Sequence, residues 1–70
     1  MNLDIREQVC LSFLRTHEGD TGLSMNELVR GISREYRSMN AEQIMNAINN
    51  LYRGGVIERR YDGRYEIPEW

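Results

Sequence analysis

The sequence predicts a mainly α-helical domain that ends in a small β-hairpin, an α+β fold class. Three segments carry apolar residues at helical spacing, and two of them begin with capping-box patterns. The C-terminal segment alternates around an Asp-Gly turn. Because the chain has 70 residues, we expect one domain over residues 1–70, either complete or excised from a longer protein.

The first helix is expected from about Leu3 to His17. Its apolar stripe consists of Ile5, Val9, Cys10, Phe13 and Leu14. The run Glu-Gly-Asp-Thr-Gly at 18–22 ends this helix and forms a loop. A buried, inert thiol is expected for Cys10 rather than a nucleophile.

The second and third helices have recognisable starts. Ser24 and Glu27 fit a capping box. Asn40 and Gln43 form a weaker pair of the same kind before the third helix, which Gly54-Gly55 ends. The second apolar stripe consists of Met25, Leu28, Val29 and Ile32, extended by Tyr36, and the third of Ile44, Ala47, Ile48 and Leu51.

The hairpin is expected to join strands at 56–60 and 64–67. A two-residue loop would place Ile57 on the opposite face of the hairpin from Tyr65 and Ile67. A three-residue loop with Gly63 in the left-handed conformation instead pairs Ile57 with Ile67 and Arg59 with Tyr65. We favour this register because it gathers the apolar side chains on one face.

The same register places Arg60 opposite Arg64 and Glu58 opposite Glu66, with attractive diagonal pairs. Three helices followed by such a hairpin form the winged helix-turn-helix architecture, in which the hairpin is the wing. A short extra strand is expected around 21–23. Trp70, at the end of the chain, either folds back onto the first helix or marks where a longer chain was cut.

The residue counts exclude several classes of protein. One Cys forms no internal disulfide, and one Cys with one His does not supply the four ligands of a structural zinc site. No apolar run approaches the roughly 20 residues of a membrane span. The N-terminus lacks the pattern of a signal peptide. We therefore expect a reducing intracellular location, with no metal, cofactor or membrane partner. The absence of a catalytic constellation or phosphate loop indicates that the protein is not an enzyme.

Two functional patterns remain open from the residues alone. The polar face Gln43, Asn46, Asn50 and Arg53 would suit base recognition in the major groove, with Arg59, Arg60 and Arg64 on phosphates. The blander interpretation is a solvated helix face, favoured by the net charge of −2. The wing arginines could equally pair with Glu58 and Glu66, or bind an acidic peptide, and the sequence does not rank these alternatives.

The pattern of residues from about Val9 to Tyr65 also resembles a known family. The matching positions are Gly22-Leu23, Leu28, Met39, the apolar residues of the third helix, Gly55, Ile57, Asp62 and Tyr65. In this spacing the chain resembles the C-terminal winged-helix domain of the middle subunit of replication protein A, the eukaryotic single-stranded-DNA-binding complex. It departs from that family in the longer connection at 33–38 and in a wing that mixes both charge signs.

The resemblance implies a nuclear protein-docking domain that accepts short, basic amphipathic helices of DNA replication, repair and damage-response factors. Other parts of a longer chain would join the remaining subunits, and direct DNA contact is not favoured. Carried over by position, the docking surface includes Gly54, Glu58, Arg59 and Asp62. With the tyrosines and arginines around them, the candidate partner-binding residues are Tyr52, Arg53, Gly54, Glu58, Arg59, Arg60, Tyr61, Asp62 and Arg64. The alternative is a duplex-DNA-binding transcriptional regulator.

Overall fold

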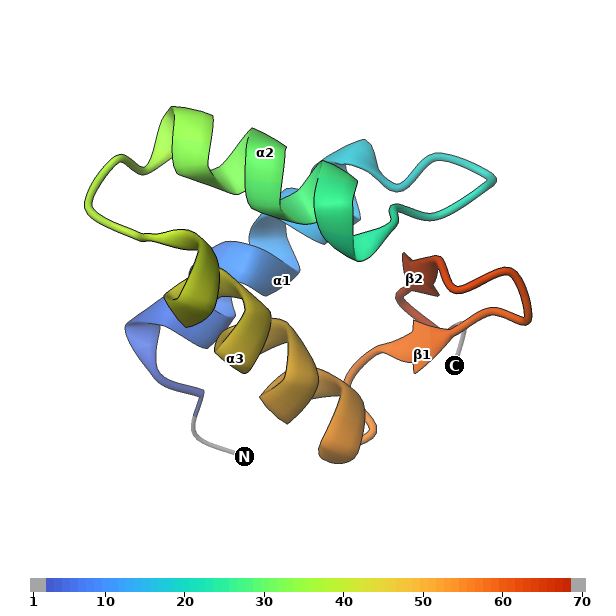
Figure 1. The fold of residues 1–70 in the computed structure, drawn as a ribbon. Coiled ribbons are helices and arrows are strands. Elements are labelled where there is room, and N and C mark those ends of the chain that lie inside the picture. The colour runs from blue at the N-terminus through green and yellow to red at the C-terminus, as the bar shows by residue number, and fades with distance from the viewer. Residues whose placement is uncertain (1–2, 69–70) are drawn as a thin grey trace.

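The computed structural model describes residues 3–68, so Trp70 lies outside the described part of the chain. Its elements are α1 (Ile5–His17), α2 (Met25–Glu35), α3 (Ala41–Arg53), β1 (Glu58–Arg59) and β2 (Tyr65–Glu66). Figure 1 shows the three helices packed together, with the hairpin beside the C-terminal end of α3. This arrangement confirms the prediction of a mainly helical, winged-helix-like α+β fold.

The starts of α2 and α3 are fixed by the predicted capping boxes. The Glu27 backbone N–H donates to the Ser24 hydroxyl at 3.1 Å, and the Ser24 N–H donates back to the Glu27 carboxylate at 3.0 Å. Asn40 and Gln43 make the equivalent pair at 2.9 and 3.0 Å. Each box satisfies two donors that a helix N-terminus otherwise leaves without a partner.

Two helix boundaries differ from the prediction. The first helix begins at Ile5 rather than near Leu3, because Asp4 and Glu7 form a third capping box that the sequence analysis missed. The second ends at Glu35, and Tyr36 leaves the helical conformation with φ −124° and ψ 81°. The side chain of Tyr36 is 41% exposed and therefore does not extend the apolar stripe of α2.

The core lies where the three helices meet each other and the hairpin. Its fully buried side chains are Cys10, Leu14, Leu28, Ile32, Ile44, Ile48, Leu51 and Ile57. Met39, Ala47 and Tyr65 complete the cluster. Burying one large aliphatic side chain contributes about 1.5–3 kcal/mol. The docking of the hairpin through Ile57 and Tyr65 is therefore part of the stability of the domain.

The hairpin has the predicted register. Glu58 pairs with Glu66 and Arg59 pairs with Tyr65 in an antiparallel ladder. Gly63 is in the left-handed region with φ 89°, and its N–H donates to the Arg60 carbonyl at 2.9 Å. The strands are two residues each, shorter than expected, because the next backbone donors bond elsewhere: the Ile57 N–H donates to the Leu51 carbonyl and the Ile67 N–H to the Glu18 carboxylate.

The loop between α1 and α2 pairs with the outer edge of β2. Leu23 and Tyr65 form an antiparallel bridge, with N–H to carbonyl distances of 3.0 and 2.7 Å. The extra strand expected at 21–23 is thus reduced to one bridge, and β2 lies between this bridge and β1. Gly22 makes the approach possible: its φ is 75°, and a Cβ there would lie 2.5 Å from the Tyr65 carbonyl oxygen.

Replacing Gly22 with alanine is expected to destabilise the domain by more than the 1–2 kcal/mol or so of a left-handed alanine. The additional loss comes from the overlap with the Tyr65 carbonyl. Gly55→Ala is the matched control, because Gly55 has the same φ of 75° and nothing within 4 Å of its Cβ position. Urea denaturation of both variants measures the difference, and equal losses would show that the close approach contributes nothing.

Candidate docking surface at the third helix and the hairpin

The candidate partner-binding residues come together at one end of the molecule. Tyr52, Arg53 and Gly54 end α3, and residues 58–64 form β1 and the hairpin loop. In Figure 1 this end of α3 lies next to β1. The side chains within this region nevertheless have different environments, and these environments determine which of them can reach a partner.

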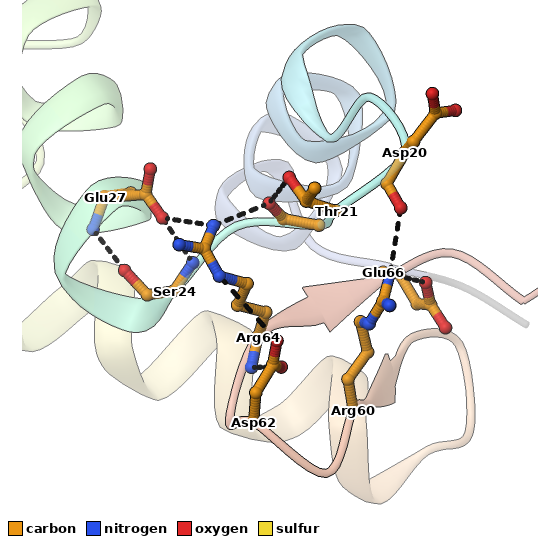
Figure 2. A network of polar contacts seen from close by, with 9 residues as sticks. Asp20, Thr21, Ser24, Glu27, Arg60, Asp62, Arg64 and Glu66 are labelled. Atoms are coloured by element: carbon orange, nitrogen blue, oxygen red, sulfur yellow. Dashed lines mark hydrogen bonds and ion pairs between the residues drawn. The ribbon is translucent and has the colours of Figure 1, made fainter.

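Arg60 is bound within the protein. Its guanidinium donates to the Asp20 carbonyl at 2.9 Å and to the Glu66 carboxylate at 3.3 Å, as Figure 2 shows. The second contact is the diagonal pair expected across the hairpin. The side chain is only 30% exposed. To bind phosphate or a partner, Arg60 would first have to release the loop between α1 and α2.

Arg64 makes a similar connection on the other side of the hairpin loop. It lies 3.1 Å from the Glu27 carboxylate and 3.4 Å from the Gly22 carbonyl oxygen (Figure 2). Asp62 accepts the Arg64 backbone N–H at 3.1 Å and lies 3.9 Å from the guanidinium. Arg64 therefore links the hairpin to the start of α2, and the charge of Asp62 is partly neutralised by a neighbour.

Four other side chains of the region point into solvent. We call Tyr52, Arg53, Arg59 and Tyr61 the Tyr–Arg surface. Tyr61 is 99% exposed and Tyr52 is 46% exposed, and both arginines are exposed. Tyr52 also packs edge-on against Tyr65, with ring centroids 6.0 Å apart. Its ring thus contacts a core residue of the hairpin while nearly half of the residue's surface remains exposed.

The polar face of α3 is only partly as the sequence analysis described it. Asn46, Asn50 and Arg53 are exposed, whereas Gln43 is half-buried and its side chain caps the helix. Glu42, which the predicted polar face leaves out, is exposed one turn before Asn46 and shares the outward face with it. The signal in the sequence is its position on the helical wheel, opposite the apolar stripe.

Cys10 and His17 lie away from this surface. Burial, with smaller contributions from Asp4 and Glu7, raises the pKa of the Cys10 thiol to about 11. His17 stacks at 4.2 Å on Phe13 and lies 3.8 Å from the Glu35 carboxylate. Neither residue has the surroundings of a nucleophile or a metal ligand.

Residues 3–68 contain no group of three or more His, Cys, Asp and Glu side chains able to hold a metal ion. No helix among them is long and apolar enough to cross a membrane. Comparisons with protein-family models, curated proteins and solved structures gave no match. The resemblance to replication protein A therefore remains a prediction from the residue pattern.

The Glu27 carboxylate provides a test of the contacts in Figure 2. Hydrogen bonds from Ser24 lower the pKa of Glu27 from 4.5, and Arg64 lowers it further. Arg64→Ala should raise this pKa while leaving it below 4.5, because the Ser24 bonds remain. Since the folded pKa is depressed, the associated stability is present above pH 4.5 and is lost as the pH falls through the folded value.

A carbon-detected NMR titration of the Glu27 side chain measures this shift. Arg59→Ala serves as the control, because Arg59 is an exposed arginine of the same hairpin with no ion pair in the part of the chain that the structure describes. An unchanged Glu27 pKa in Arg64→Ala would contradict the contact.

Cys10 should resist thiol reagents at neutral pH while the protein is folded. Its side chain is fully buried, and its pKa of about 11 leaves little thiolate. Labelling should accelerate in urea with the same midpoint as unfolding followed by circular dichroism. Rapid labelling of the native protein would contradict the assigned environment.

Proposed function

We propose that this chain is a docking domain of a replication protein A-like single-stranded-DNA-binding complex. It would recruit DNA replication, repair and damage-response factors in the nucleus. A helical segment of the partner would lie along the C-terminal end of α3 and the hairpin. The spacing of residues from Val9 to Tyr65 supports the family, and the exposed Tyr–Arg surface supports the mode of action.

The observation that carries this proposal is the exposure of aromatic and arginine side chains on the end of α3 and on the hairpin that follows it. Tyr and Arg are enriched among the residues that dominate the energy of protein interfaces. Tyr61 is fully exposed at the hairpin loop, where its ring contributes nothing to the core. Burying it against a partner would gain the apolar contact that the isolated domain leaves unused.

An amphipathic helix is a suitable partner for such a surface. Its apolar side chains would contact Tyr52 and Tyr61, and its polar side chains would reach the charges beside them. The interface would be small and partly electrostatic, so its affinity should fall as the salt concentration rises.

Duplex-DNA binding is the second candidate, because Asn46, Asn50 and Arg53 are exposed along one side of α3. Three observations disfavour it. Arg60 and Arg64, two of the three wing arginines it requires, are bound within the protein. Glu42 shares the outward face of α3 and would approach phosphates, and the net charge is −2.

An NMR titration of the labelled domain tests the proposal against this second candidate. The probes are duplex DNA and two amphipathic peptides with the same leucine face, one flanked by glutamates and the other by lysines. Docking predicts that at least one peptide shifts the amides of residues 52–61 while DNA leaves them unchanged. DNA-induced shifts along Asn46 and Asn50, with both peptides silent, would overturn the proposal.

Tyr61→Ala is expected to lower the affinity for the peptide that binds by about tenfold or more, which corresponds to about 1.4 kcal/mol or more of binding free energy. The fold should be unaffected, because the ring is 99% exposed. Tyr36→Ala is the matched control: this tyrosine is also exposed but lies between α2 and α3. Fluorescence anisotropy with the labelled peptide measures both affinities, and equal losses would contradict a role for the hairpin loop.

A further inference from the structure

The two faces of the hairpin carry different sets of charged side chains. Side chains that face each other across an antiparallel ladder lie on the same side of it, and neighbours along a strand lie on opposite sides. Arg59 is opposite Tyr65, and Glu58 is opposite Glu66. The face that includes Tyr65 therefore bears Arg59, whereas the other face bears two glutamates together with Arg60 and Arg64, which carboxylates of the protein itself bind.

The glutamate face belongs to an acidic hollow. The hairpin and the end of α1 line this hollow together. Its carboxylates come from Glu18, Asp20, Glu58 and Glu66, against one lining arginine, Arg15. Two of these groups are engaged within the protein: Glu66 with Arg60, and Glu18 with the Ile67 backbone N–H at 3.0 Å. The two hairpin glutamates thus point away from the Tyr–Arg surface.

The opposite face carries free positive charge. Tyr65 contacts Tyr52, so Arg59 and the end of α3 border the same side of the hairpin. Arg53 and Arg59 have no ion pair within residues 3–68. Asp62 is next to Gly63, which the Arg59 guanidinium approaches, but its polar contacts are with Arg64, whose backbone N–H it accepts. The uncompensated charge at the Tyr–Arg surface is therefore positive.

We propose that the segment docked by this domain is an acidic amphipathic helix, seated on the Tyr–Arg surface with its carboxylates on Arg53 and Arg59. This inference rests on the proposed docking function and specifies its partner. Arginine binds carboxylates through two parallel hydrogen bonds, which adds orientation to attraction. The family resemblance implies a basic helix instead. Such a helix would meet like charge at the Tyr–Arg surface, and the hairpin carboxylates that could attract it lie on the other face.

Affinities for the two leucine-faced peptides test the charge of the partner. The glutamate peptide should bind at least about tenfold more tightly than the lysine peptide at low salt. Arg59→Glu should reverse or abolish this preference. Arg37→Glu is the matched control, because it reverses the same charge at an exposed arginine that lies between α2 and α3, away from the hairpin. It should leave the preference intact.

A second control separates a specific site from general attraction to arginine. Arg30→Ala removes one exposed arginine from α2 and should not change the affinity for the glutamate peptide. Circular dichroism checks that each variant is folded, which is expected because all three side chains are exposed.

The outcomes distinguish this inference from the function on which it rests. Preference for the lysine peptide, with shifts at Glu58 and Glu66, would overturn the acidic partner and leave the docking function standing. If Arg30→Ala and Arg59→Glu lowered the affinity for the glutamate peptide equally, the acidic partner would also be overturned. If neither peptide shifts residues 52–61, the docking function itself fails, and the acidic partner fails with it.

Discussion

The bridge between Leu23 and Tyr65 positions the hairpin against the helices. Its two hydrogen bonds tie β2 to the loop between α1 and α2, and the missing side chain of Gly22 permits the approach. Because Tyr65 is held at its backbone, its ring enters the core beside Ile57 and Tyr52. The candidate docking surface depends on this bridge, since the alternation of side chains along β1 and β2 follows from the placement of Tyr65.

The arginines of the hairpin reinforce the same connection. Arg60 reaches the Asp20 carbonyl from one side of the hairpin loop, and Arg64 reaches Gly22 and Glu27 from the other (Figure 2). Exposed ion pairs contribute only about 0–1 kcal/mol each. Bonds to loop carbonyls add direction, so these two side chains fix the hairpin angle more than they stabilise the fold. Their use inside the protein leaves Arg59 as the hairpin arginine whose charge faces solvent.

Local patterns predicted most of the fold. The capping boxes of α2 and α3, and the register set by Gly63, each depend on residues within a few positions of one another. The box of Asp4 and Glu7 has the same pattern, but a helix start at about Leu3 places Asp4 inside the helix rather than at its N-cap. The spacing of Tyr36 suits the apolar stripe of α2, and the sequence therefore predicts it as part of that stripe. The helix ends at Glu35, one residue before Tyr36.

The environment of the site could not be predicted in the same way. Outside the hairpin, the partners of Arg60 and Arg64 lie 37 to 42 residues earlier in the chain, so three neighbouring arginines looked equivalent in the sequence. The different environments of these three arginines also show why the net charge of −2 is a poor guide to the partner. Exposed charges act over about 8 Å at physiological ionic strength. A partner on the Tyr–Arg surface therefore responds to Arg53 and Arg59 first, while the carboxylates behind the hairpin repel it only weakly.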